Sequence, residues 1–238
     1  MIDKMVGKTE VALYGLAYSI GMLVQLFISG MNSALTPWMY SRIKKGDIRS
    51  MRKVLQLLSI VVVGIAVALM LISPELVLIF GSPKYREAVY VIPPVAASVF
   101  FIFIYNILSM PQFYYEKTQF LMAASMAAAG ANVVLNFIFI RLFGYIAAGY
   151  TTLACYMLYS VGHYIVSKRI LVNEGIQENL MSPGFLVACS VFLIGASIIC
   201  NLIFPYRILR YAILLASAGL VFWKKELLQK TMADIRKK

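Results

Sequence analysis

Six long stretches of this sequence contain no charged residue, and they are spread along almost the whole chain. They are, in order, Val11–Ser41, Val54–Ser73, Ala88–Tyr115, Thr118–Ile140, Leu142–Ser167 and Leu180–Tyr206. Each is at least 20 residues long, and about 20 apolar residues are enough for a helix to cross the hydrocarbon core of a bilayer. Only 13% of the chain is charged, against about 25% in a soluble domain. The sequence therefore predicts an all-α integral membrane protein.

We expect about seven transmembrane helices of this length. Their expected bounds are Val11–Thr36, Val54–Ser73, Ala88–Met110, Gln119–Ile140, Tyr145–Val166, Pro183–Phe204 and Arg207–Trp223. The expected organisation is a stub at 1–10, five helices over 11–166, a loop at 167–182, two helices over 183–223 and a basic tail at 224–238. The longest polar insertion has only 12 residues, Lys168–Asn179. No water-soluble catalytic domain fits between the helices.

The distribution of lysine and arginine predicts the orientation of these helices. If the first helix runs inward, 15 of the 22 basic residues lie on the inner side, six of them in Arg42–Lys53. Positive charge collects in loops that face the cytoplasm, so we expect the N-terminus outside and the C-terminus inside. The net charge of +12 is then explained by topology, and no nucleic-acid partner is expected.

Two local features refine the expected helices. Ser73-Pro74-Glu75 resembles the start of a new helix, with a serine cap and proline in the first turn, so we expect residues 76–80 to lie at the outer interface. Only 13 residues separate Arg210 from Lys224 in the last helix. The charged ends of that helix are therefore expected to extend outward to the interface.

The ionisable residues give little support to catalysis. None of the ten acidic residues lies in the middle of an expected helix, and the single histidine, His163, is expected to be an interfacial residue near the inner end of the fifth helix. Cys155, Cys189 and Cys200 lack the spacing of metal ligands. We expect no enzyme activity, no metal and no cofactor. A membrane glycan polymerase or acyltransferase would need His163 as its base.

Neutral amides are the polar groups expected at bilayer depth. The substrate-path candidates among them are Gln25, Asn32, Asn106, Asn132 and Asn136. A buried amide is costly unless it is hydrogen-bonded, so these side chains either connect helices or line a passage for a hydroxyl-rich substrate such as a glycan. Asn132 and Asn136 are four residues apart and share one helical face.

Three cations are expected at the outer interface: Lys84, Arg86 and Arg141. They are candidates for contact with a phosphate through charge-assisted hydrogen bonds. The alternative is that they anchor the protein to the headgroups of membrane lipids.

Four segments together resemble the polysaccharide-transport branch of the multidrug/oligosaccharidyl-lipid/polysaccharide exporter superfamily. They are NVVLNFIFIRLFGYIAAGYTTL at 132–153, PWMYSRIKKGD at 37–47, SPELVLIFGSPKYREAVYVIPP at 73–94 and MIDKMVGKTEVALYGLAYSI at 1–20. The first segment departs from the family pattern at Arg141-Leu142, where a Pro-Lys or similar pair is common, and at Gly149, where alanine is common. The resemblance covers about Met1 to Tyr159.

This resemblance implies the C-terminal half of an exporter with about fourteen helices, whose two lobes rock in alternating access. It implies flipping of undecaprenyl-pyrophosphate-linked oligosaccharides across the bacterial inner membrane, with membrane lipids and an N-terminal half or a second copy as partners. The family's basic cavity positions would lie in the other half, and Gln25 stands in the first helix here. The alternatives are a drug or metabolite exporter of the same superfamily and a truncated, non-functional half.

Overall fold

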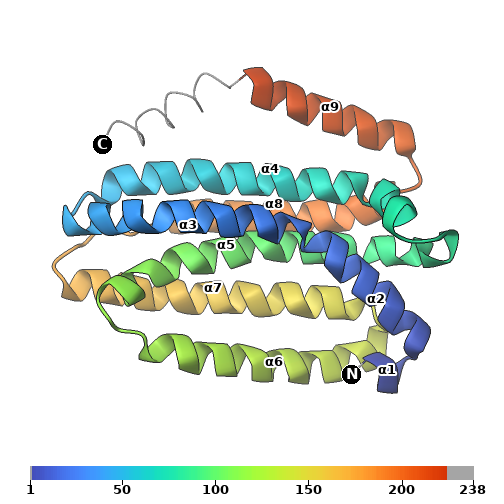
Figure 1. The fold of residues 1–238 in the computed structure, drawn as a ribbon, viewed down its shortest axis with the longest axis horizontal. Coiled ribbons are helices and arrows are strands. Elements are labelled where there is room, and N and C mark those ends of the chain that lie inside the picture. Colours follow the sequence, from blue (N-terminus) through green and yellow to red (C-terminus); the bar gives the residue numbers. More distant parts are fainter. Residues whose placement is uncertain (1, 224–238) are drawn as a thin grey trace.

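Helices follow one another through residues 2–223, the part of the chain that the computed structural model describes (Figure 1). The elements are α1 (Ile2–Met5), α2 (Lys8–Gly21), α3 (Leu23–Lys44), α4 (Ile48–Phe80), the 3₁₀ helix η1 (Pro83–Tyr90), α5 (Ile92–Tyr114), α6 (Gln119–Phe143), α7 (Ala147–Asn173), α8 (Pro183–Ile203) and α9 (Arg207–Trp223). The predicted all-α membrane fold is confirmed. The predicted basic tail at 224–238 lies outside the described residues.

Five helical segments of the described chain are long and apolar enough to span a membrane: Lys8–Lys44, Ile48–Phe80, Ile92–Tyr114, Gln119–Phe143 and Pro183–Ile203. They correspond to five of the seven expected spans. The other two, α7 and α9, are helices where the sequence predicts them but do not belong to this group. Helix α7 also continues to Asn173, into the predicted loop at 167–182.

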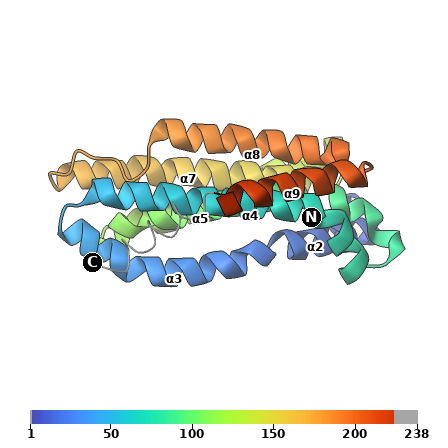
Figure 2. The same cartoon turned by 90° about the horizontal axis from the view of Figure 1, so that it is seen from above.

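The connections gather at two opposite ends of the bundle. The α3–α4 and α7–α8 loops lie at one end in both views, and η1 and the α8–α9 turn lie at the other (Figures 1 and 2). The basic segment Arg42–Lys53 contains the α3–α4 loop, whereas Lys84 and Arg86 belong to η1. The basic segment Arg42–Lys53 and the two η1 cations therefore lie at opposite ends of the described bundle.

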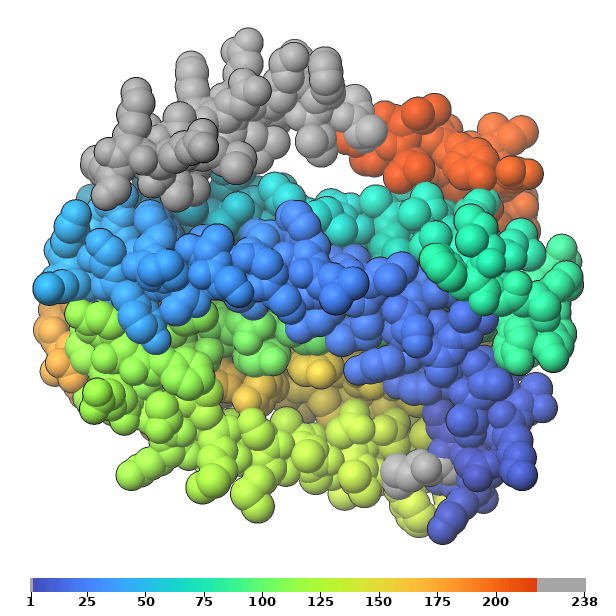
Figure 3. Space-filling model, in the orientation of Figure 1, coloured from blue at the N-terminus to red at the C-terminus, as the bar shows by residue number. Residues whose placement is uncertain are grey.

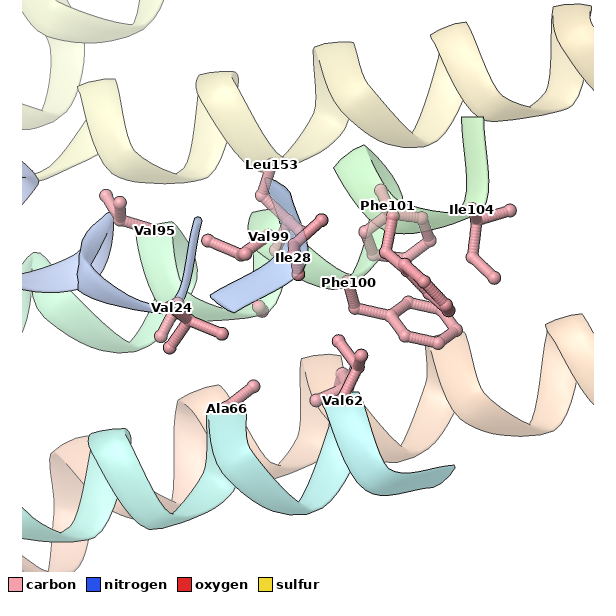
Figure 4. Close-up of a cluster of buried hydrophobic side chains, with 14 of the residues drawn as sticks. Val24, Ile28, Val62, Ala66, Val95, Val99, Phe100, Phe101, Ile104 and Leu153 are labelled. Carbon is pink, nitrogen blue, oxygen red and sulfur yellow. The ribbon is translucent and has the colours of Figure 1, made fainter. Parts of the chain in front are cut away.

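Helix α5 forms the centre of the bundle. It is mostly apolar and buried along most of its length, as expected for a surrounded helix, and it contacts α2, α3, α4, α7 and α8. Phe100 and Phe103 are among its fully buried side chains. Figure 4 shows the α5 residues Val99 and Phe101 between Ile28 of α3, Val62 of α4 and Leu153 of α7.

The first predicted span, Val11–Thr36, is divided between α2 and α3. At the break the amide of Gln25 donates to the carbonyl of Met22 at 2.9 Å, a tighter three-residue turn. Gly21 lies against α5, where an added Cβ would be 2.6 Å from Cγ1 of Val95. The close approach to α5 explains why glycine is needed here, and α2 leaves the axis of α3 at this point (Figure 1).

The predicted new helix at Pro74 is wrong, because α4 continues through this residue to Phe80. Proline cannot donate the usual hydrogen bond to the carbonyl four residues earlier, which belongs to Met70. The hydroxyl of Ser73 donates to that carbonyl at 2.7 Å, and Nη1 of Arg210 donates to the Leu71 carbonyl at 2.6 Å. Ser73 thus replaces the donor that the proline lacks, and Arg210 adds a donor to the next carbonyl, so the helix passes through the proline.

Helix α4 begins with a side-chain cap in the predicted cytoplasmic loop. A carboxylate oxygen of Asp47 accepts a hydrogen bond from the backbone amide of Ser50 at 3.3 Å, and the other oxygen pairs with Arg42. Hydrogen bonding from Ser50, and then the Arg42 guanidinium, hold the pKa of Asp47 below its usual value. The cap stays ionised and satisfies a free amide at the start of the helix.

Gly149 allows α7 to approach the start of α5. An added Cβ would lie 3.0 Å from Cγ of Pro94 and 3.3 Å from the carbonyl oxygen of Val91. Because overpacking costs about 1–3 kcal/mol, we expect Gly149→Val to lower the free energy of unfolding by that amount. Thermal unfolding in detergent measures the change. The control is Gly130→Val on α6, where nothing lies within 4 Å, and equal destabilisation by both would contradict the prediction.

Candidate substrate cavity

A cavity of about 510 Å³ lies between α2, α5, α6 and α7. Its lining consists of hydroxyl, amide, thiol and small side chains: Tyr14, Tyr18, Tyr105, Ser125, Ala128, Ala129, Asn132, Thr152, Cys155, Tyr156 and Tyr159. Figure 3 shows the surface hollowed between the helices of the N-terminal segment and α6, with α7 behind. The cavity is therefore open to the outside of the bundle.

Five tyrosines form the aromatic part of the lining. The rings of Tyr105 and Tyr156 are nearly parallel, with centroids 6.2 Å apart, and Tyr105 also contacts the ring of Tyr159 at 4.7 Å. Across the cavity, the rings of Tyr14 and Tyr18 stack at 5.8 Å. Each ring presents an apolar face together with a polar hydroxyl, so the walls suit a ligand that has both kinds of surface.

The predicted amides of α6 belong to one hydrogen-bond chain beside the cavity. Asn136 donates to Oδ1 of Asn132 at 2.8 Å, and the hydroxyl of Thr151 donates to Oδ1 of Asn136. Asn132 itself lines the cavity and donates to the sulfur of Cys155 at 3.6 Å. Asn136 lines a neighbouring hollow of about 280 Å³ that shares Tyr14 with the cavity. The chain of bonds holds Asn132 in place.

The cavity lining carries no carboxylate, lysine or arginine. Hydroxyls and amides can donate and accept hydrogen bonds without a formal charge. The described residues also contain no group of three His, Cys, Asp or Glu side chains suited to a metal ion. The described lining of the cavity can bind an uncharged, hydrogen-bonding ligand.

Three of the five predicted substrate-path amides lie away from this cavity. Gln25 and Asn32 are on α3, and the side-chain oxygen of each is buried without a hydrogen-bond partner in the described structure. Asn106 is on α5 and does not line the cavity. The structure thus brings Asn132 and Asn136 together and separates them from the other three.

The three predicted phosphate-contact cations are all exposed. Lys84 and Arg86 belong to η1, and Lys84 lies over the ring of Tyr85 at 5.2 Å. The guanidinium of Arg141 stacks on Phe137 at 3.9 Å, at the end of α6. None of the three lines the cavity.

His163 is fully buried, so its expected interfacial position is wrong. Its Nδ1 lies 2.8 Å from Nε2 of Gln112, and its ring meets the edge of Tyr159 at 4.5 Å and of Phe120 at 5.4 Å. The ring is held among aromatic side chains next to the cavity and does not line it. Its helix is packed against α5, which places the ring toward the centre of the bundle.

Sequence reasoning missed the tyrosines of the cavity. Tyr14 and Tyr18 are four residues apart on α2, and Tyr156, Tyr159 and His163 follow one another at intervals of three and four residues on α7. This spacing places each set on one helical face. It is the signal that could have indicated an aromatic wall, although it does not show which helices face one another.

A family model described as MatE matches residues 1–138, which is more than half of the chain. The chain belongs to the MatE family. No curated protein and no solved structure matches it. MatE proteins are membrane exporters of the multidrug/oligosaccharidyl-lipid/polysaccharide superfamily, and they are transporters rather than enzymes.

The MatE match covers α1 to α5 and most of α6. It includes Tyr14, Tyr18, Tyr105 and Asn132, so three of the four helices around the cavity lie in the matched region. The chain is a multi-pass membrane protein with the apolar helices of an exporter.

Proposed function

We propose that this MatE-family chain is the C-terminal lobe of a flippase for undecaprenyl-pyrophosphate-linked oligosaccharides in the bacterial inner membrane. The observation that carries this proposal is the uncharged cavity, lined by five tyrosines and Asn132. Sugar rings present hydroxyl groups at their edges and C–H groups on their faces. Tyrosine and asparagine side chains match both kinds of surface without the cost of burying a charge.

The open side of the cavity supports a two-lobed carrier. Alternating access requires a site between two rigid bodies that move against each other. Here α2 and α6 form the rim of the cavity, and no described helix closes it on the outside. A separate N-terminal half or a second copy of the chain would supply the opposing wall.

The second candidate is export of an aromatic or cationic drug or metabolite. The five tyrosines favour it, because an organic cation is attracted to the face of an aromatic ring. The absence of a carboxylate among the cavity residues weakens it, because a cation buried there would have no opposite charge.

Reconstitution in liposomes distinguishes these functions. The chain, alone and together with an N-terminal MatE half, is incorporated into vesicles that carry a fluorescent polyprenyl-pyrophosphate oligosaccharide. The expected result is movement of the glycan to the inner leaflet with both halves present, measured as protection from a reagent added outside. Transport of ethidium without glycan movement would favour the drug exporter. Movement of neither substrate would contradict the proposal.

A further inference from the structure

A second surface feature lies on the other side of α7, away from the tyrosine cavity. An apolar groove of about 180 Å³ runs between α5, α7 and α8. Its walls include Phe100 and Ile104 of α5, Val161 of α7, and Leu186 and Val187 of α8. Val161 and Val187 are more than half exposed, so the groove opens toward the membrane.

The two serines in this groove do not make it polar. The hydroxyl of Ser160 donates to the carbonyl oxygens of Phe101 and Tyr156, both at 2.9 Å. The hydroxyl of Ser190 donates to the carbonyl of Leu186 at 2.7 Å. Both hydroxyls are thus bound to backbone oxygens, and the groove presents hydrocarbon to its occupant.

One end of the groove meets a basic hollow of about 440 Å³ on α7, and Tyr164 lines both. The hollow carries Lys168 and Arg169, which follow Tyr164 and Ile165 after one helical turn. Val161, Tyr164 and Lys168 repeat at three- and four-residue intervals, so they form one continuous face of α7. This face changes from apolar to cationic toward the predicted cytoplasmic end.

The two cations have no carboxylate partner in the described part of the chain, 2–223. Glu174 is paired with Lys117 at 2.8 Å, and Glu178 is paired with Arg49 at 3.1 Å. The nearby acids of the α7–α8 loop are therefore used by other cations. At the junction, the buried hydroxyl of Tyr164 also finds no partner among these residues.

We propose that this combined surface binds one anionic, phosphate-bearing lipid from the surrounding membrane. One acyl or prenyl chain lies in the groove between α7 and α8, and the phosphate contacts Lys168 and Arg169. The match rests on shape and charge together, because a hydrocarbon groove that ends in two unpaired cations complements a lipid with an anionic head. The site is independent of the tyrosine cavity and of the transported substrate.

Lipid titration with native mass spectrometry tests the site on the full chain in detergent. The probes are dioleoyl phosphatidylglycerol, dioleoyl phosphatidylcholine and millimolar inorganic phosphate as a competitor. K168Q/R169Q should weaken phosphatidylglycerol binding about 30-fold, since each cation near a membrane surface contributes about fivefold. The matched control K44Q/K45Q removes two exposed cations from the end of α3 and should leave binding unchanged.

The groove is tested separately from the charges. Val187→Trp fills the groove, whereas Val191→Trp lies one turn later on α8, is equally exposed and does not line it. The proposal expects V187W, but not V191W, to weaken phosphatidylglycerol binding at least tenfold. Equal binding of phosphatidylcholine, no effect of V187W, or displacement by inorganic phosphate would each overturn it. None of these results depends on whether the chain transports glycans.

Discussion

Replacing Glu75 by alanine is expected to lower the free energy of unfolding by about 3 kcal/mol and to loosen α9. The guanidinium of Arg210 binds both carboxylate oxygens of Glu75, at 2.8 and 2.9 Å, and its side chain is only 4% exposed. Removing one partner of a buried ion pair costs about 3–5 kcal/mol, because it leaves an uncompensated charge. The lower value applies because Glu75 is 27% exposed.

Helix α9 is joined to α4 by this ion pair. Its described contacts with the rest of the bundle are to α4 and α8, and Tyr211 adds a hydrogen bond to Glu75 at 2.9 Å. Thermal unfolding in detergent measures the change in stability. Hydrogen exchange of the α9 backbone amides measures whether α9 is released from the bundle. Arg207→Met is the control, because Arg207 is exposed and contacts only Tyr211 of its own helix among the described partners.

A double-mutant cycle separates the ion pair from other effects. If Glu75 acts mainly through Arg210, then Glu75→Ala combined with Arg210→Met should cost little more than Arg210→Met alone. Arg210→Met also removes the donor to the Leu71 carbonyl, so it should be the more damaging single change. Additive costs, or wild-type stability of Glu75→Ala, would show that the pair does not hold α9.

The helices could be predicted from the sequence because long apolar segments in a membrane have few alternatives. With no water to bond the backbone, each such segment must satisfy its polar groups internally, as a helix does. The sequence-based predictions are wrong where a side chain from a distant segment contacts the helix. Pro74 would end an isolated helix, but Ser73 supplies the donor that the proline lacks and Arg210, from a distant helix, binds the next carbonyl. Arg210 was expected to reach the interface, yet it turns inward to Glu75.

The candidate site was predictable only in part for the same reason. Asn132 and Asn136 share a helical face by spacing alone, and the structure joins them by a hydrogen bond. That Tyr14 faces Thr152, 138 residues later, at 3.5 Å depends on how α2 crosses α7. The spacing of residues along one helix does not determine how that helix crosses another. The choice between a structural amide and a cavity amide likewise depends on which helix lies opposite.

Replacing both Asn132 and Asn136 by leucine is expected to abolish glycan export in the intact transporter while leaving the protein folded. The double change removes the only amide among the described residues that line the cavity, and it leaves the Ser125 hydroxyl as the one polar group of their α6 wall. Each hydrogen bond removed costs about 0.5–1.5 kcal/mol, and each sugar hydroxyl that is left buried without a partner costs about 1–3 kcal/mol. Export is measured as leaflet transfer of the fluorescent lipid-linked oligosaccharide.

The stability of this variant follows from the bonds that remain. Thr151 loses its contact with Asn136 but still donates to the carbonyl of Ala148 at 3.1 Å, so no hydroxyl is left unpaired. The matched control is Asn201→Leu, which breaks a bond of 3.0 Å between α8 and Tyr150 of α7 outside the cavity. It removes an interhelical amide without changing the lining, so export should persist. Unchanged export in the double variant would show that Asn132 and Asn136 only pack helices together. Loss of export in Asn201→Leu as well would show that the loss of any amide between helices abolishes transport, wherever it lies.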